Sequence, residues 1–497
     1  MSEYEKLVAR GRELAVLGST ASVLSWDQET YLPPAGVAFR AEQMAELSSL
    51  AHTRATAPEI GEWLASCEGA NGKLDPLQRA NVREWRRDYD KATRLPNRLV
   101  KELTEATSLA RERWVAARQE RDFEQFRPAL EKVLALTHEK ADCLREGKDG
   151  LSAYDALLDE YEPGAEAEAL RPVFAELRDA IVELLPAALA ISEQAQVNRL
   201  RGDYPQAKQE EFNRAAAMAI GFDFDAGRID TTTHPFCTGL GPRDVRLTTR
   251  YDERDFTSSF FGVLHEVGHG LYGQGLRADA FGTPAGEDVS LGIHESQSRL
   301  WENQVGRSEA FWRVWYPTAR EVFGNLEGLE MDEFLLIVNR VEPSYIRVEA
   351  DELTYNLHII LRFELEQALF DGSLAVADLP GAWNEKFESM FGFAVDHDSN
   401  GCLQDVHWSL GALGYFPTYT LGNLNAAQLF DAAREQIEGF DAQLATGDYS
   451  GLLAWLRENV HEKGRTLSPD ELMRAATGRP TEAHHLVSYL RQKYAEA

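Results

Sequence analysis

The sequence predicts a mostly α-helical protein with a small β element near the middle of the chain. From Tyr4 to about Gln196, apolar residues recur at intervals of three and four, as in segments 126–148 and 170–192, which is the spacing of amphipathic helices. Between residues 221 and 255 the chain is rich in Thr, Arg and Gly and partly alternates between polar and apolar residues. This segment predicts a short antiparallel sheet of two or three strands.

Turns and loops divide the helical segments in order. Three turns interrupt the first helices: Pro33-Pro34, Leu95-Pro96 and the Tyr-Glu-Pro-Gly sequence at 161–164. Residues 276–292 predict a loop, a helix begins at about 293, and helical spacing continues through 346–372. Residues 414–423, marked by Gly and Pro, predict a turn before the last helices. No repeat, low-complexity tract or long linker marks a boundary, so we expect one domain over residues 1–497.

Composition and charge narrow the class of protein. With 44% hydrophobic and 27% charged residues in 497, the chain is typical of a globular protein with a large core. Its formal net charge of −30 repels nucleic acid and anionic membranes, so an enzyme of small molecules or peptides fits better. No run approaches the ~18 apolar residues that span a bilayer. Charges throughout residues 1–19 argue against a secretory signal, and the four cysteines lack C-x-x-C spacing. We therefore expect a cytoplasmic protein with reduced thiols.

Two histidines four residues apart flank a glutamate inside a long apolar stretch. On a helix, His265 and His269 lie on one face about one turn apart, so both can bind one metal ion, with Glu266 beside them. Zinc held by two imidazoles and a carboxylate keeps a position for water, lowers the pKa of that water toward ~7, and lets an adjacent carboxylate take its proton. Gly268 and Gly270 favour a site, because a helical glycine costs about 1 kcal/mol against alanine and usually marks a close approach. The alternative is a helix whose histidines only satisfy hydrogen bonds in a core.

A third ligand is required, and the candidate lies downstream. The zincin pattern HExxHxxGxxH fails, because positions 272 and 275 are Tyr and Gly. We favour Glu295, at the start of a predicted helix, because a site of two His and one Glu leaves the metal open for hydrolysis. His294 is an alternative ligand or a hydrogen-bonding partner of one. Glu287 and Asp288, in the preceding loop, are further alternatives.

Six motifs, in order along the chain, resemble those of the Taq-type metallocarboxypeptidases, which are helical HExxH zincins. The motifs are HPF at 234–236, DVRLT at 244–248, HEVGH at 265–269, HESQ at 294–297, IRVEAD at 346–351 and GCLQDVHW at 401–408. The N-terminal sequence SWDQETYLPP at 25–34 is also similar, so the resemblance covers essentially the whole chain.

The resemblance implies a saddle-shaped helical protein with a deep substrate groove, often a homodimer, that releases single residues from peptide C-termini with broad specificity. It places the active-site half at about 221–425. Carried over by position, it makes His265, His269 and Glu295 the metal ligands and Glu266 the general base.

An enzyme that acts on free C-termini must recognise a carboxylate, and a guanidinium does this in a fork that a lysine cannot match. Arg347 in IRVEAD is our first candidate, and we expect Asp351, four residues later, to orient it. Arg246 in DVRLT is either a helper or a structural arginine. The alternative for either arginine is a purely structural role, on the surface or in an ion pair.

A tetrahedral intermediate also needs hydrogen-bond donors for its oxyanion. His407 in GCLQDVHW and Tyr419 in the 414–423 segment suit this role, and Tyr415 is a weaker candidate because aromatic residues in such turns often only pack. His234 of HPF either shapes the end of the groove or is a buried structural histidine.

The leading hypothesis is a cytoplasmic zinc-dependent carboxypeptidase of peptides with free C-termini. Metal-activated water, deprotonated by Glu266, attacks the last peptide bond while Arg347 holds the terminal carboxylate. Cobalt or manganese also suits such ligands. An oligopeptidase that cuts internally is one alternative. A helical binding protein with a metal site but no turnover is another, and the presence of Glu266 argues against it.

Overall fold

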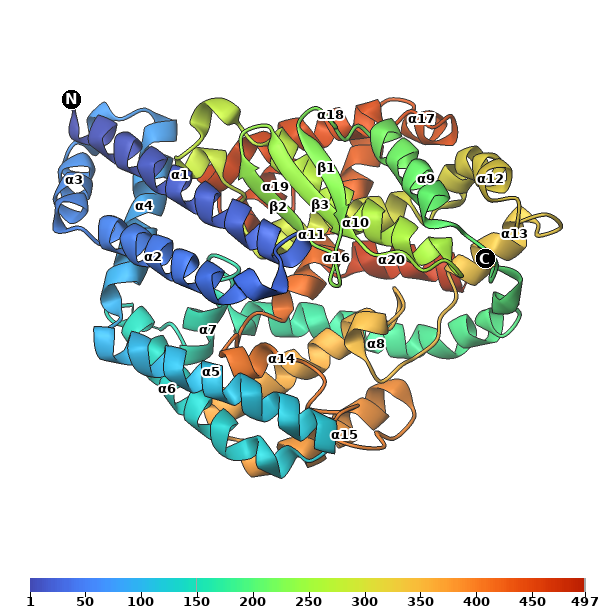
Figure 1. The fold of residues 1–497 in the computed structure, drawn as a ribbon, viewed down its shortest axis with the longest axis horizontal. Coiled ribbons are helices and arrows are strands. Elements are labelled where there is room, and N and C mark those ends of the chain that lie inside the picture. Colours follow the sequence, from blue (N-terminus) through green and yellow to red (C-terminus); the bar gives the residue numbers. More distant parts are fainter. Residues whose placement is uncertain (149, 496–497) are drawn as a thin grey trace.

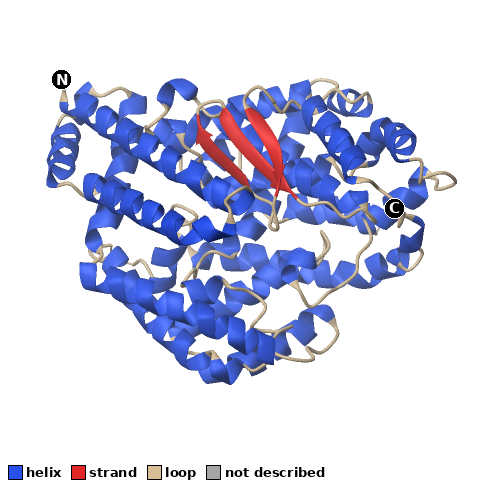
Figure 2. Ribbon diagram, viewed as in Figure 1, coloured by secondary structure: helices blue, strands red, loops and turns tan. Residues whose placement is uncertain are grey.

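The computed structural model describes residues 1–148 and 150–495 and confirms a mostly helical protein (Figure 1). Figure 2 shows the strands as one small sheet set among helices. Helices form the chain up to this sheet: α1 (Glu3–Thr30), α2 (Val37–Ala55), α3 (Pro58–Gly69), α4 (Pro76–Arg94), α5 (Asn97–Glu120), α6 (Arg127–Arg145), α7 (Ala153–Leu158), α8 (Ala167–Ser192) and α9 (Gln206–Ala219). The predicted turns at 33–34, 95–96 and 161–164 all fall between helices.

The sheet lies directly before the helix that carries the histidine pair. Its strands are β1 (Gly227–Thr231), β2 (Cys237–Gly241) and β3 (Asp244–Thr249). β2 and β3 pair antiparallel as predicted, because a two-residue turn can join only antiparallel neighbours. β1 lies on the other side of β3 and pairs with it in parallel, so the sheet is mixed.

Helices again dominate after the sheet: α10 (Phe256–Gly275), α11 (Leu291–Arg299), α12 (Glu309–Phe323), α13 (Met331–Val338), α14 (Tyr355–Asp371), α15 (Leu379–Phe391), α16 (Pro417–Gln436), α17 (Phe440–Ala445), α18 (Ser450–Asn459), α19 (Pro469–Thr477) and α20 (His484–Tyr494). A π-helical turn, Leu300–Val305, continues α11. None of the helices in the described part of the chain combines the length and apolarity needed to cross a bilayer.

Two helix starts differ from the prediction. Helix α14 begins at Tyr355 and not at 346, because the Asp351 carboxylate accepts the N–H groups of Leu353 and Thr354 and so ends the irregular segment before the helix. Helix α16 begins at Pro417, so much of the predicted turn at 414–423 is helical. Proline suits the first position of a helix, where the missing N–H would have no partner.

Two large apolar cores flank the middle of the molecule. One is built mainly from α5 to α8, α14, α15 and α20, and the other from α9, the sheet, α10, α12, α13 and α17 to α19. Helix α16 belongs to both, since Leu421 and Leu424 pack in the first core while Leu429 and Phe430 pack in the second. Helix α16 thus lies along the boundary between the two cores, the seam, and connects them.

Candidate active site

Helix α10 presents the histidine pair toward α11. Asp255 caps the start of α10 by accepting the Thr257 N–H, and the two imidazole centroids are 4.9 Å apart, one helical turn. A Cβ at Gly268 would lie 2.4 Å from the Gln297 carbonyl oxygen, so the backbones of α10 and α11 touch at this point. The glycine is therefore required by the close approach of the two helices.

Glu295 on α11 completes a three-residue cluster. Its Oε2 lies 3.7 Å from Nε2 of His265 and 3.5 Å from Nε2 of His269. One ligand atom from each of the three side chains lies within 4.8 Å of the others. This is a separation that one divalent ion can bridge.

The other nitrogen of each histidine has its own partner. Nδ1 of His265 is 2.9 Å from the Glu302 carboxylate, in the π-helical turn after α11, and Nδ1 of His269 is 3.0 Å from the His294 carbonyl oxygen. A carboxylate or carbonyl at Nδ1 fixes the tautomer in which Nε2 is free to bind metal. The donor set and its orientation therefore fit a divalent metal ion.

Arg299 ties the carboxylates of this cluster together. Its Nε donates to Glu295 Oε1 over 2.7 Å, and its Nη1 donates to Glu302 Oε2 over 3.1 Å. Burial raises the pKa of Glu295, but Arg299 and the two histidines outweigh it and hold that pKa well below its usual range. Glu295 is thus ionised, as a ligand must be.

The two histidines differ in their surroundings. Burial, together with the neighbouring His294, lowers the pKa of His269 to about 3. Burial also opposes protonation of His265, but Glu295 and Glu302 raise its pKa overall. His269 is thus a neutral imidazole, while His265 is held between two carboxylates.

Glu266 lies beside the cluster without belonging to it. Its side chain is buried, and burial raises its pKa to about 7. A carboxyl group of this pKa can both accept and release a proton near neutral pH.

The other predicted ligands lie elsewhere. Nδ1 of His294 is 2.6 Å from Nδ1 of His269, on the side of that ring opposite Nε2. Glu287 pairs with Arg465 over 2.8 Å, and Asp288 lines the groove beyond His269. The described geometry thus brings Glu295, and not these three residues, to the two Nε2 atoms.

A second polar cluster lies on the other side of the seam and is built around Arg347. The Arg347 guanidinium donates from Nε and Nη2 to Asp405 Oδ1, over 3.0 and 2.9 Å, and Arg362 donates from Nε to Asp405 Oδ2 over 2.7 Å. Arg347 is 6% exposed and Arg362 is 0% exposed. Two guanidinium groups against one carboxylate leave one net positive charge in this buried cluster.

Tyr355 and Arg299 connect the two clusters. Arg347 Nη1 donates to the Tyr355 hydroxyl over 3.0 Å, and the Arg299 guanidinium lies 4.7 Å from the centre of the Tyr355 ring. Since Arg299 also binds Glu295, an unbroken chain of contacts runs from the metal ligand to Arg347.

Asp351 does not orient Arg347, which corrects the prediction from their spacing. Residues 347–349 form a single 3-10 turn, so positions four apart do not share a helical face. The Asp351 carboxylate instead accepts the Thr354 N–H over 2.9 Å, and Asp405 takes the expected place beside the guanidinium.

The predicted oxyanion donors lie around this arginine. The Tyr419 ring centre is 5.0 Å from the Arg347 guanidinium and 6.4 Å from the His407 ring. Burial raises the pKa of both Tyr415 and Tyr419, and the Glu295 charge adds to this. Burial lowers the pKa of His407 to about 4, so its imidazole is neutral.

The comparisons with known proteins agree with this geometry. The sequence profile of the Carboxypeptidase Taq (M32) metallopeptidase family matches residues 6–494. The chain belongs to this family. It is 47% identical to thermostable carboxypeptidase 1 of Thermus thermophilus over 99% of this chain and 98% of that protein. It is 36% identical to carboxypeptidase 1 of Bacillus subtilis over 97% and 96% of the two chains.

Solved structures show the same fold. The M32 carboxypeptidase of Deinococcus radiodurans superposes with a TM-score of 0.96 at 42% identity, and metallocarboxypeptidase 1 of Trypanosoma cruzi with 0.95 at 37% identity, each over 99% of both chains. The chain is thus a metallocarboxypeptidase, a peptide hydrolase that depends on a divalent metal.

Two predicted site residues of this M32 enzyme lie outside both clusters. Arg246 pairs with Asp244 over 2.9 Å on the same face of β3, and its guanidinium lies 4.3 Å from the centre of the Trp26 ring in α1. His234 is exposed in the segment between β1 and β2. It is therefore not the buried structural histidine that was its alternative interpretation.

Several supporting residues of the M32 site were missed. The sequence holds weak signals for some of these residues. Glu302 follows Glu295 by seven residues, on the same helical face, and Asp405 lies within the motif GCLQDVHW, whereas Arg299 has no such signal. Arg362 lies in an ordinary apolar helix and has no sequence signal.

The sequence predicted only a turn at Glu162, but in the structure its side chain makes hydrogen bonds at the start of α11. Its two carboxylate oxygens accept the Ser290 hydroxyl over 3.0 Å and the Gly292 N–H over 2.9 Å, and burial raises its pKa to about 7. A carboxylate at the first turn of a helix is favourable, because it meets free N–H groups. Glu162 thereby helps to fix the helix that carries Glu295.

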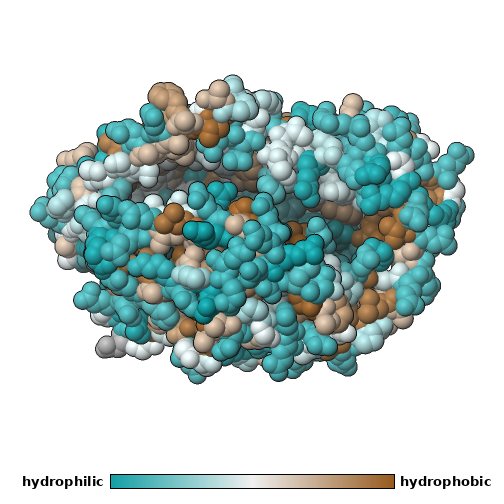
Figure 3. Space-filling model, turned by 60° about the horizontal axis from the view of Figure 1, so that its bottom comes forward, coloured by the Kyte–Doolittle hydropathy of each residue, from teal (hydrophilic) through white to brown (hydrophobic). Residues whose placement is uncertain are grey.

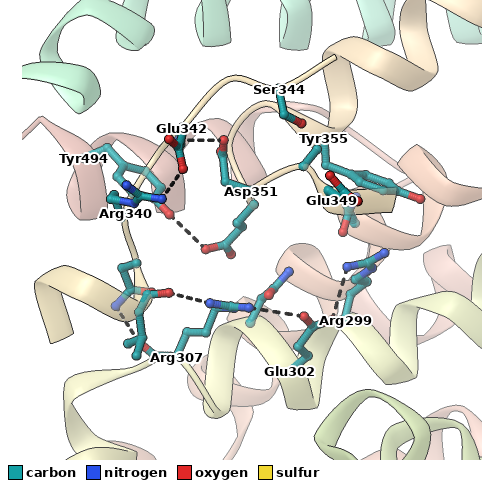
Figure 4. Close-up of a pocket in the computed structure, with 16 residues that line it drawn as sticks. Arg299, Glu302, Arg307, Arg340, Glu342, Ser344, Glu349, Asp351, Tyr355 and Tyr494 are labelled. Carbon is teal, nitrogen blue, oxygen red and sulfur yellow. Dashed lines mark hydrogen bonds and ion pairs between the residues drawn. The ribbon is translucent and has the colours of Figure 1, made fainter. Parts of the chain in front are cut away.

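Cavities open on both sides of the metal ligands. A groove of about 1070 Å³ is lined by His269 and His294, among others. A cavity of about 350 Å³ is lined by Arg299, Glu302 and Tyr355, with Asp351 on the opposite wall (Figure 4). Figure 3 shows one face of the molecule, with a hollow between its upper and lower parts. The larger groove thus reaches His269, and the smaller cavity reaches the two residues, Arg299 and Glu302, that contact Glu295 and His265.

Glu302→Ala should weaken zinc binding about 10- to 100-fold, because His265 loses the carboxylate that holds its Nε2 toward the ion. Competition against a chromophoric chelator measures this affinity. Glu302→Gln keeps an acceptor oxygen and should lose less. Glu309→Ala, at an exposed pair on α12, is the control and should bind zinc like the wild type. Equal affinity in Glu302→Ala and the wild type would contradict the role of this contact.

Glu366 of α14 should make the free energy of unfolding depend on pH. It accepts hydrogen bonds from Trp408 Nε1, the Gly414 N–H and the Tyr154 hydroxyl, and burial raises its pKa from 4.5 to about 7. The folded chain thus keeps this proton where the unfolded chain has lost it. The stability due to the protonated group is fully present below pH 4.5 and is lost as the pH rises to about 7.

In Glu366→Gln this loss should disappear. The free energies of unfolding of variant and wild type are measured by denaturant titration from pH 4.5 to 8. As the pH rises, their difference should grow in favour of the variant by up to about 3 kcal/mol. The exposed Glu105→Gln is the control and should give a constant difference. A constant difference for Glu366→Gln as well would show that this carboxyl is ionised in the folded protein.

Proposed function

We propose that this metallocarboxypeptidase removes single amino acids from peptide C-termini, with broad specificity and with a free terminal carboxylate as the recognised feature. The observation that carries this proposal is the buried cluster of Arg347, Arg362 and Asp405. Its net positive charge is out of water and one chain of contacts away from Glu295. A buried excess charge of this kind is costly until an anion enters, so the cluster is prepared for one carboxylate.

His265, His269 and Glu295 would hold the metal ion, which we assign as zinc, with cobalt or manganese as substitutes of the same ligand preference. When bound, such an ion polarises a carbonyl oxygen and lowers the pKa of water. Arg299 and Glu302 keep the ligand side chains in the orientation needed for binding.

Glu266 acts as the general base. Its buried carboxylate takes the proton of the water that attacks the last peptide bond, and it then gives that proton to the leaving amine. A pKa raised to about 7 by burial supports both transfers, because the group is neither a very weak base nor a very weak acid at neutral pH.

Arg347 binds the substrate's terminal carboxylate, and Asp405 and Tyr355 position its guanidinium. His407 and Tyr419 donate hydrogen bonds to the oxyanion that forms at the scissile carbonyl. The neutral state of His407 and the position of the Tyr419 ring, 5.0 Å from the Arg347 guanidinium, support these roles.

Arg246 and His234 are assigned to the groove wall rather than to the reaction. The pair with Asp244 and the contact with Trp26 support a structural Arg246 that joins β3 to α1. We propose that the exposed His234 contributes to the end of the groove.

We further propose one domain over the whole chain, working as a homodimer in the cytoplasm. Helix α16 belongs to both cores, which supports one cooperative unit. All four cysteines are free, which supports a reducing compartment.

Glu266→Gln should keep the metal but lose at least ~100-fold in kcat, because it removes a proton acceptor and not a ligand. Glu295→Gln should instead weaken metal binding itself. Metal content after dialysis and kcat at saturating zinc separate the two variants. Equal loss of metal in both variants would show that the roles of Glu266 and Glu295 are wrongly assigned.

Arg347→Ala tests the proposed function directly. A charge-assisted contact to a carboxylate contributes about 1.5 to 3 kcal/mol, or about tenfold to a hundredfold in kcat/KM, and only for substrates with a free C-terminus. The variant should lose this factor on a free peptide and hardly change on its amidated counterpart. Arg347→Lys should recover only part of the loss.

The wild type is measured on the same peptide pair. If amidation makes no difference to it, the enzyme is an oligopeptidase. If Arg347→Ala loses equally on both peptides, Arg347 is structural, and Arg246→Ala is the next variant to measure.

A further inference from the structure

A second group of potential metal ligands lies far from α10 in the sequence, at the start of α20. Glu482, His484 and His485 each offer one ligand atom, and these atoms lie within 4.8 Å of one another. The group is partly exposed and shares no residue with the site on α10 and α11. We propose that Glu482, His484 and His485 form a second divalent-metal site at the start of α20.

Asp431 of α16 orients one of these ligands. Its Oδ2 is 2.8 Å from Nδ1 of His485. A carboxylate at Nδ1 holds the proton there and leaves Nε2 as the free donor, which is the arrangement that Glu302 gives to His265. The same device thus occurs at both groups of ligands.

The backbone of the ligand segment is also held in place. Gln428 accepts the Glu482 N–H over 3.0 Å, and the Thr481 hydroxyl donates to Asn425 over 2.7 Å. Asn425 and Gln428 are buried, and together with Asp431 they lie at intervals of three along one face of α16. The segment that supplies the ligands is therefore fixed before any ion binds, which lowers the entropy lost on binding.

The charges favour a cation over an anion. Glu482 Oε2 lies 3.2 Å from Nδ1 of His484, and the imidazole centroids of His484 and His485 are 3.8 Å apart. Two carboxylates, those of Glu482 and Asp431, face these rings, and Arg479 approaches Glu482 only to 3.7 Å. The partial positive charge at the start of α20 opposes a cation, but the two carboxylates and a net chain charge of −30 offset it.

The donor types select the class of metal. Two imidazoles and one carboxylate prefer zinc, cobalt or nickel to magnesium or calcium, which require oxygen ligands. Partial exposure makes this site weaker than the buried one, and bound metal would stabilise the folded protein without taking part in hydrolysis. The effect would reach the active-site side of α20, because Lys493 and Tyr494 at its other end both contact Glu352, next to the segment that carries Arg347.

Figure 1 shows how this contact fits the fold, with α16 and α20 side by side beneath α10 and α11. An ion held by these ligands would fix the start of α20, and the contact of His485 with Asp431 would pass this constraint to α16. Helix α16 also packs against α11, which carries Glu295.

Zinc stoichiometry tests the proposal. Protein freed of metal by chelation is dialysed against buffered zinc, and the bound metal is counted. The wild type should bind about two ions per chain, His265→Ala/His269→Ala about one, and His484→Ala/His485→Ala about one while keeping the wild-type kcat. The exposed His52→Ala on α2 is the matched control and should bind about two.

A second measurement uses the His265→Ala/His269→Ala protein. Zinc should raise its Tm, and adding His484→Ala and His485→Ala should abolish that rise. If His484→Ala/His485→Ala binds as much zinc as the wild type, or if the wild type binds one ion only, the second site does not exist and the contacts of Glu482 and Asp431 are ion pairs alone. Failure of the proposed catalytic site would show differently, as full zinc binding by the His265→Ala/His269→Ala protein.

Discussion

The site depends on helix α11 being clamped between α10 and α16 at two glycines. A Cβ at Gly268 would lie 2.4 Å from the backbone of Gln297, and a Cβ at Gly422 would lie 2.4 Å from Cγ of Glu295. Any larger side chain at either position would move α11 and with it the third ligand. Because packed interiors do not deform smoothly, this contact sets the distance between Glu295 and the two histidines more firmly than any single hydrogen bond does.

Placing two carboxylates at this clamp creates an electrostatic problem, and Arg299 resolves it. Glu295 is buried and Glu302 is partly buried, the pKa of each is held low, and one guanidinium donates to both of them. Breaking a buried pair by removing one partner costs several kcal/mol, since an unpaired charge remains out of water. The free protein can therefore keep its ligand carboxylate ionised before metal arrives, and Arg307 near Glu302 Oε1 adds a second positive charge to the same network.

The sequence predicted which three side chains come together around α10, but it did not predict the residues that support them, for a physical reason. His265, His269 and Glu295 are linked by helical spacing and by the chemistry of zinc, which are both local properties. Arg362 and Glu162 act through contacts with residues 43 and more than 120 positions away, and no local pattern records such pairs. Asp351 shows the opposite error, because helical spacing was applied to a segment that is not helical. The parallel pairing of β1 was missed similarly, since strand order is set by tertiary packing.

The two cores place the cluster around Arg347 and the cluster around Glu295 on opposite sides of the seam, and the two clusters differ in their balance of charge. On the α10 side, Glu295 and Glu302 are balanced by arginines, so the ligand cluster is close to neutral before metal binds and becomes positive with it. On the α14 side, Arg347 and Arg362 exceed Asp405 by one charge. In the proposed function, a substrate that carries its anion at the chain end would satisfy that excess with its last peptide bond toward Glu295, since contacts through Tyr355 and Arg299 connect the two clusters. On this proposal, exopeptidase selectivity would follow from where the unbalanced charge is buried, and it would need no barrier that closes the groove.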